Sequence, residues 1–115
     1  MKTIYVDIDK TLCLPKNKSM DYENVTPIEG NIQKVNYLYD EGNTIICWTA
    51  RGTKTGLNWF DLTYKQLKLW NVKFHELRMG KPAYDLLIDD KAINSINGWT
   101  NNSYEVAYNG KNSDY

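Results

Sequence analysis

Apolar residues along this chain occur in two alternating patterns. Short continuous runs lie at residues 4–8, 44–48, 72–77 and 84–88. Runs of this length are typical of strands that are buried in a parallel sheet. Between them, apolar residues recur every three or four positions, which is the spacing of one helix face. The pattern therefore predicts strands that alternate with helices.

The first predicted helix covers residues 27–41. Thr26 suits the N-cap, Pro27 suits the first helical position, and Gly42 ends the pattern. The preceding stretch, residues 13–25, mixes proline, lysine and asparagine and predicts a flap or hairpin that overhangs the end of the first strand.

A second predicted helix follows the run at 44–48 and ends near Asn71, which suits a left-handed C-cap. Its buried face is predicted to consist of Leu57, Phe60, Tyr64 and Leu67. Further on, the sequence predicts a short helix at 91–96 and a weak edge strand at 104–108.

Strand and helix alternation with short connections predicts an α/β fold, a Rossmann-like three-layer sandwich around a central, mainly parallel sheet. With 115 residues, the chain has the length for one hydrophobic core. We therefore expect a single domain at residues 1–108, with the flap at 13–25, and a flexible tail at 109–115.

Charge and cysteine content narrow the functional classes. Lys plus Arg number 14, as do Asp plus Glu, so we expect no basic surface for nucleic acid or for an anionic membrane. No signal-like segment and no apolar run near 20 residues is visible, which predicts a cytoplasmic protein. Cys13 and Cys47 are then expected to be free thiols.

Two carboxylates come at the end of the first strand. Asp7 and Asp9 are two residues apart, so their side chains share one face of the extended chain. Two carboxylates that converge repel each other unless a cation lies between them or one holds a proton. The pair therefore indicates a hard divalent cation, for which Mg²⁺ is the common choice.

Further polar residues follow the later strands. Thr49 and Arg51 come after the run at 44–48, Lys81 lies in a predicted turn, and Asp89 with Asp90 follows the run at 84–88. The carboxyl ends of parallel strands meet at one edge of the sheet, where α/β proteins bind ligands. Carboxylates, a hydroxyl and a lysine gathered at that edge predict a phosphate site.

The order of these residues resembles the four motifs of the haloacid dehalogenase superfamily. Residues 7–11 match its D-x-D-x-T motif, and Thr49, Lys81 and Asp89-Asp90 follow in the family's order. The runs at 49–52 and 80–91 further resemble a small capless subgroup, the capsule-biosynthesis phosphatases. Neither interval between motifs has room for a cap domain, so this resemblance implies an open site and leaves room for a homo-oligomer.

The resemblance implies a role for each carboxylate. Asp7 would be the nucleophile that forms an aspartyl-phosphate. Asp9 would be general acid and then general base, with its carboxyl kept off the metal. Asp7, the backbone carbonyl of Asp9 and Asp89 would hold Mg²⁺, and Asp90 would act through water or Lys81.

It also implies how the phosphoryl group is held. The hydroxyl of Thr49 and the backbone amide of Ala50 would bind it, Lys81 would neutralise it and also meet the Asp7 carboxylate, and Thr11 would brace the loop after the nucleophile. Lys10 stands where the family often has glycine; a loop that needs a positive φ at this position tolerates lysine poorly, and Lys10 could also face the substrate.

Some of these residues have simpler interpretations. Arg51 is expected either to contact a second anionic group of the substrate at the mouth of the site or to form a structural salt bridge. Thr49 and Asp89-Asp90 also suit helix N-caps. His75, the single histidine, is expected to be hydrogen-bonded or exposed near the third strand.

The function that the resemblance implies is Mg²⁺-dependent hydrolysis of a phosphomonoester. The expected substrate is a sugar phosphate or related small metabolite of surface polysaccharide synthesis. One alternative is a nucleotidase or nucleic-acid end phosphatase, for which a base-stacking pocket or basic groove is expected. A non-catalytic accessory module with the same fold is the alternative of another class.

Overall fold

The computed structural model describes residues 1–17 and 21–109. It divides into two compact units, Met1–Ala83 and Tyr84–Tyr115. The first unit contains the sheet and most of the predicted site residues.

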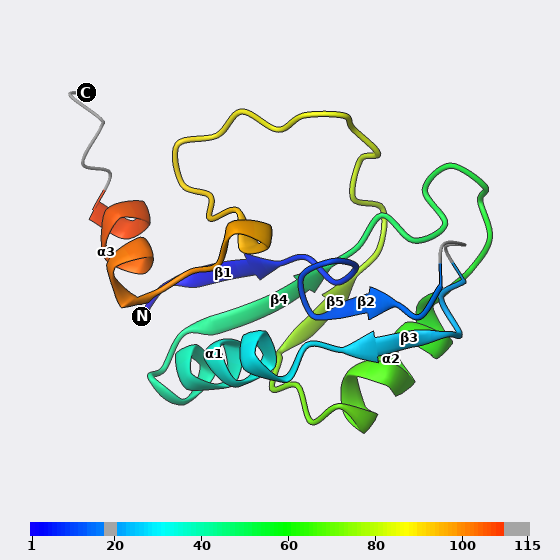
Figure 1. Cartoon of the computed structure of the whole chain (residues 1–115), viewed down its shortest axis with the longest axis horizontal. Coiled ribbons are helices and arrows are strands. Elements are labelled where there is room, and N and C mark those ends of the chain that lie inside the picture. Colours follow the sequence, from blue (N-terminus) through cyan, green and yellow to red (C-terminus); the bar gives the residue numbers. More distant parts are fainter. Residues whose placement is uncertain (18–20, 110–115) are drawn as a thin grey trace. The chain divides into compact units, whose positions relative to one another are not determined.

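A parallel sheet of three strands forms the centre of the first unit. Its strands are β1 (Thr3–Val6), β4 (Thr44–Trp48) and β5 (Glu76–Arg78), in the order β1-β4-β5. β1 and β4 pair in parallel from Thr3 opposite Thr44 to Val6 opposite Cys47. Both strands point the same way, so the loops that follow them leave at the same edge (Figure 1). The strand prediction at 44–48 is confirmed, and the strand predicted at 4–8 is present but covers Thr3–Val6.

The core of this unit is built from the apolar runs and one face of each helix. Ile45 and Cys47 of β4 and Val35 of the helix α1 (Glu29–Asp40) are 0% exposed, as are Ile8 and Leu12 beyond β1. Ile8 and Leu12 are buried at the start of the loop that carries Asp7 and Asp9, so the same packing that closes the core anchors this loop.

The predicted flap is a hairpin. β2 (Cys13–Pro15) pairs antiparallel with β3 (Val25–Pro27), and Cys13 lies opposite Pro27. The predicted N-cap at Thr26 is therefore wrong, because Thr26 and Pro27 belong to a strand. α1 begins later, with Ile28 at the N-cap position and no side-chain cap. Pairing with β2 overrides the local helix-start signal.

The helix α2 (Phe60–Leu69) lies where the spacing predicts it, but its buried face differs. Thr63, Gln66 and Leu67 are buried, whereas Leu57, Phe60 and Tyr64 are exposed. Two polar residues are buried here because they bind the guanidinium of a buried arginine, described below. After α2 the predicted C-cap is confirmed: Asn71 has φ of 58°.

The third strand lies later in the chain than residues 72–77. His75 holds the chain just before β5, because its backbone N–H donates to the Ile45 carbonyl at 2.8 Å and its Nδ1 accepts from the Ile45 N–H at 3.0 Å. Its ring also stacks on Tyr39 at 4.6 Å. The prediction that His75 is hydrogen-bonded is confirmed.

The second unit differs most from the sequence predictions. It contains the 3₁₀ helix η1 (Ser95–Asn97) and α3 (Asn101–Asn109). The strand expected at 84–88 is absent, and Leu86 and Ile88 are 75% and 89% exposed. A strand needs a neighbouring backbone, and the described residues of this unit contain no other strand. The strand expected at 104–108 is also wrong, because these residues belong to α3. Near the helix expected at 91–96, the described residues form only the short 3₁₀ helix η1. Residues 110–115 of the expected tail lie outside the described residues.

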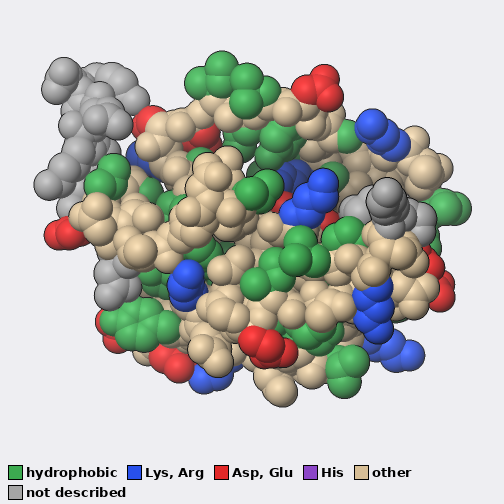
Figure 2. All heavy atoms as spheres, in the orientation of Figure 1, with side chains coloured by type: hydrophobic (Ala, Val, Ile, Leu, Met, Phe, Trp, Pro, Cys, Tyr) green, Lys and Arg blue, Asp and Glu red, His purple; other side chains and the backbone are tan. Residues whose placement is uncertain are grey.

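On the face drawn in Figure 2, acidic and basic side chains are interspersed, in keeping with the equal charge counts.

Within the described parts of the chain, no helix combines the length and the apolar character needed to cross a lipid bilayer.

Candidate active site

Asp7 lies directly after β1, at the carboxyl edge of the sheet. Its side chain is 36% exposed, and its Oδ1 lies 3.2 Å from Nζ of Lys81. The hydroxyl of Thr11 lies 3.5 Å from its other oxygen. The structure thus brings together the predicted nucleophile, the predicted phosphate-neutralising lysine and the predicted bracing threonine.

Thr49 follows β4 directly and lies beside this group. Its backbone N–H donates to the Arg78 carbonyl, and its own carbonyl accepts from the Lys81 N–H, both at 3.0 Å. These two bonds fix the loop that carries Lys81 against the end of β4. Thr49 itself is only 1% exposed, and its hydroxyl accepts the backbone N–H of Arg51 at 3.1 Å. The more accessible phosphate-binding candidate is therefore Ala50, which is half-buried.

Asp9 has a different cation from Asp7. The guanidinium of Arg51 binds both of its carboxylate oxygens, through Nε at 3.0 Å and Nη2 at 2.8 Å. This pairing is bidentate, the strongest arrangement of arginine with a carboxylate. The Arg51 side chain is 0% exposed and that of Asp9 is 19% exposed. Arg51 therefore does not lie at the mouth of the site; the salt-bridge alternative is the observed one.

The other nitrogen of Arg51 is also fully engaged. Nη1 donates to Oγ1 of Thr63 at 3.1 Å and to Oε1 of Gln66 at 2.6 Å. The ring of Tyr22 covers the guanidinium at 4.7 Å. Because a buried charge is tolerated only when it is paired and hydrogen-bonded, this set explains why α2 buries two polar residues. Removal of one partner from a buried pair costs about 3–5 kcal/mol.

Gln66 connects this group to the hairpin. Its Nε2 donates to the backbone carbonyl of Tyr22 at 2.5 Å, while its Oε1 accepts from Arg51. Tyr22 also contacts Trp59 edge-to-face at 5.1 Å. The hairpin, the loop after β4 and α2 are thus joined around one guanidinium.

The two thiols are buried and unreactive in character. Burial, and then the neighbouring Asp9 carboxylate, raise the pKa of the Cys13 thiol to about 12. Burial alone raises the pKa of Cys47 to about 12. Since the thiolate is the nucleophile, neither cysteine is suited to attack a substrate. Both are free, as the sequence predicts.

Lys10 has φ of 67°, so the loop after Asp9 does need the left-handed conformation that glycine adopts most easily. The tight turn is held by the Lys10 N–H, which donates to the Cys13 carbonyl at 2.7 Å. Lys10 thus adopts a positive φ although it is not glycine.

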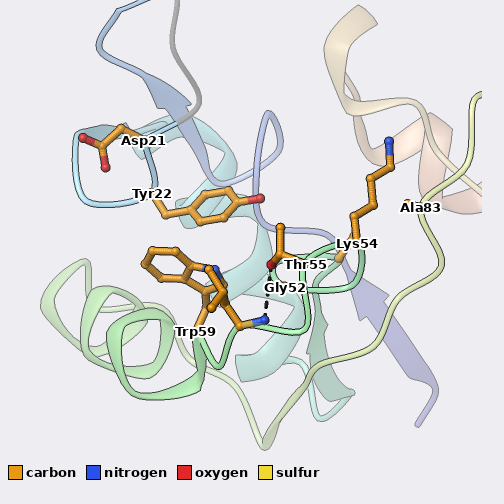
Figure 3. A pocket seen from close by; sticks show the side chains of 9 residues that line it. Asp21, Tyr22, Gly52, Lys54, Thr55, Trp59 and Ala83 are labelled. Atoms are coloured by element: carbon orange, nitrogen blue, oxygen red, sulfur yellow. Dashed lines mark hydrogen bonds between the residues drawn. The ribbon is translucent and has the colours of Figure 1, made fainter.

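A pocket of about 440 Å³ opens beside the loop after β4. Its lining includes Ala50, Tyr22, Trp59 and Lys54. Tyr22 and Trp59 lie on one side and Lys54 extends on another (Figure 3). Gly52 at the pocket wall has φ of 84°, and a Cβ there would lie 2.2 Å from the Leu57 carbonyl oxygen. The loop after β4 therefore folds back closely on itself at Gly52, and this shapes the pocket.

The sequence predictions missed the residues that line this pocket. Tyr22 lies within the predicted flap or hairpin at 13–25, and the sequence pattern singles out neither Lys54 nor Trp59 as a site residue. The sequence signal that could have found them is their position. Tyr22 is an aromatic residue in the flap, and Lys54 and Trp59 lie in the loop that follows Thr49.

The donor groups of the first unit fit a Mg²⁺ ion that takes only a few of its ligands from the protein. Mg²⁺ in phosphate-transfer sites is held by one or two carboxylates together with substrate oxygens and water. Asp7 supplies a partly exposed carboxylate, and the Asp9 carbonyl lies two residues further on. No group of three or more His, Cys, Asp or Glu that could hold a metal exists among the described residues.

Asp89 and Asp90 belong to the second unit, and both are exposed. Oδ1 of Asp89 accepts the backbone N–H of Lys91 at 2.9 Å. This hydrogen bond, followed by one with Asp90, lowers the pKa of Asp89. Asp89 is thus available as an ionised carboxylate, and its part in metal binding stays a prediction.

Comparisons with known proteins show the fold. No family model matches the sequence, and no curated protein matches it. The crystal structure of a structural-genomics target from Vibrio cholerae superimposes with a TM-score of 0.80, at 23% identity, over 96% of this chain and 99% of that chain. The chain therefore has an α/β fold with a central parallel sheet.

Proposed function

We propose that this chain is a Mg²⁺-dependent phosphomonoester hydrolase of the haloacid dehalogenase type, which acts on a sugar phosphate or a related small metabolite of surface polysaccharide synthesis. The observation that supports this most is the pair of Asp7 and Lys81, 3.2 Å apart, at the carboxyl edge of the sheet. A partly exposed carboxylate beside a lysine suits attack on a phosphate dianion, because the lysine lowers the repulsion between the two anions.

In this proposal, Asp7 attacks phosphorus in line. The bond between phosphorus and the leaving oxygen breaks, and an aspartyl-phosphate forms. Water then attacks phosphorus and restores Asp7 with release of inorganic phosphate. Lys81 neutralises the charge of the phosphoryl oxygens, and the Ala50 amide donates a hydrogen bond to them. Asp9 gives a proton to the leaving oxygen and then takes one from the attacking water. Asp7, the Asp9 carbonyl and Asp89 are the residues that would hold Mg²⁺, which would supply the remaining positive charge when bound.

The leaving group would lie in the pocket beside Ala50. Because Ala50 lines the pocket, a phosphoryl group at its amide would direct the rest of the substrate toward Tyr22, Trp59 and Lys54. Aromatic side chains contact the apolar faces of ring compounds, and a lysine attracts a further anionic group.

The first test is phosphate release from a panel of sugar phosphates, nucleotides and p-nitrophenyl phosphate, with and without Mg²⁺. We expect Mg²⁺-dependent release that Asp7→Asn abolishes, because asparagine cannot form the acyl-phosphate. A nearby carboxylate outside the site, Asp61→Asn, serves as the matched control and should retain activity.

Two outcomes would contradict the proposal. Appreciable turnover by Asp7→Asn would exclude Asp7 as the nucleophile. No release from any substrate by the folded wild-type protein would favour the accessory-module alternative. Preference for nucleotides over sugar phosphates would keep the reaction but replace the substrate by that of a nucleotidase.

A further inference from the structure

The two carboxylates of the first loop have separate cations. Asp7 pairs with Lys81 at 3.2 Å, whereas both oxygens of Asp9 are bound by Arg51. Side chains two residues apart in an extended segment share a face, so without these partners both carboxylates would be free to converge on one cation. The structure directs them to different partners instead.

Other contacts hold Arg51 in place, so its guanidinium cannot move together with the Asp9 carboxylate. Its Nη1 is bound by Thr63 and Gln66 of α2 at 3.1 and 2.6 Å, and its side chain is 0% exposed. The Tyr22 ring covers it at 4.7 Å. The donors of the guanidinium thus go to Asp9 and to α2, and Nη2 also donates to Sγ of Cys13 at 3.8 Å. These contacts fix the direction of the Asp9 carboxylate.

We infer that Arg51 is a positioning residue, which holds the Asp9 carboxylate toward α2 and keeps it from joining Asp7 as a further metal ligand. The inference rests on the proposed function. A carboxylate bound to Mg²⁺ could not carry the proton of the reaction. Gln66, which also binds the Tyr22 carbonyl, links this positioning to the hairpin.

The test is binding of Mg²⁺ alone, measured by isothermal titration calorimetry on the full chain. Arg51→Lys keeps the charge but replaces the planar fork by a single nitrogen, which cannot hold both oxygens of Asp9 and α2 together. We expect the released carboxylate to tighten Mg²⁺ binding on the order of tenfold. Arg51→Met should tighten it further, since the cation itself is lost.

Asp9→Asn in each background separates positioning from charge. If the gain comes from the Asp9 carboxylate, Arg51→Lys with Asp9→Asn should lose it entirely. Arg78→Lys, the same exchange at an exposed arginine of β5, should leave Mg²⁺ affinity unchanged. A structural role for Arg51 alone would weaken binding or leave it unchanged, never strengthen it.

The outcomes are distinct. Wild-type protein that binds no Mg²⁺ would overturn the proposed function, and this inference with it. Wild-type protein that binds Mg²⁺, with an affinity that folded Arg51→Lys does not raise, would overturn the inference alone. Circular dichroism identifies the folded variants, and Arg51→Lys decides the result should Arg51→Met fail to fold.

Discussion

Arg51 and Lys54 lie three residues apart in one loop, yet their surroundings are opposite. Arg51 is 2% exposed and binds Asp9, Thr63 and Gln66. Lys54 is exposed and lines the pocket beside Ala50. The guanidinium suits the buried position because its five donors can all be satisfied there. A second anionic group on the substrate would therefore meet Lys54, where the sequence had suggested Arg51.

Lys54→Ala should raise KM for substrates with a second anionic group by roughly two- to fivefold, because an exposed ion pair contributes about 1 kcal/mol or less. Steady-state kinetics on two phosphate esters that differ only in a carboxylate would measure this. Lys65→Ala, at an exposed position of α2 that does not line the pocket, is the control. An equal change for both esters would exclude a charge contact with Lys54.

At the scale of the element, α2 shows how a buried polar group can change the face of a helix that its apolar spacing predicts to be buried. The sequence places Leu57, Phe60 and Tyr64 on its buried face, but the helix turns Thr63 and Gln66 inward to bind Arg51. An unpaired buried charge costs far more than the exposure of aromatic side chains, so the guanidinium decides the orientation. The exposed rings of Phe60 and Tyr64 stack on each other instead, at 5.9 Å.

The orientation of α2 has a direct test in stability. Leu67 is 0% exposed and Leu69 is 77% exposed. Leu67→Ala should lower the free energy of unfolding by about 2–5 kcal/mol, because it removes buried contacts and leaves a cavity. Leu69→Ala changes the same residue type in the same helix and should stay within about 0.5 kcal/mol. Equal losses in urea denaturation would show that α2 packs through a different face.

At the scale of the whole molecule, the predicted carboxylates come from both compact units. Asp7 and Asp9 lie in Met1–Ala83, and Asp89 lies in Tyr84–Tyr115. Asp89 is exposed and its pKa is lowered, chiefly by the hydrogen bond from the Lys91 N–H. Asp89 is thus an ionised carboxylate of the second unit, and its part in binding Mg²⁺ stays a prediction.

Asp89→Asn should weaken Mg²⁺ binding by at least about tenfold, because it removes a charged ligand. Asp85→Asn is the matched control, since Asp85 is an exposed carboxylate of the same unit and lies outside the motif. Calorimetric titration with Mg²⁺ compares the two. Equal affinities for Asp89→Asn and wild type would remove Asp89 from the ligand set.

The sequence predicts local elements well where only burial decides them. The strand at 44–48 has the bounds of β4, and Asn71 ends α2 in the left-handed conformation. The predictions fail where a partner elsewhere in the chain decides. Thr26 pairs with Leu14 and so lies in a strand, whereas residues 84–88 form no strand, and the described residues of their unit contain no other strand.

The same division holds for the candidate site. The sequence alone determined which residues follow the parallel strands, because an apolar run of strand length has to be buried and its polar neighbours then lie at the sheet edge. Asp7, Asp9, Thr49 and Arg51 are placed in this way. The contact between Lys81 and Asp7 agrees with the role that the resemblance implies for Lys81. Only the tertiary structure decided that Arg51 is the cation that pairs with Asp9. Asp9 and Arg51 are 42 residues apart, and the spacing along the chain carries no information on the distance between two such side chains.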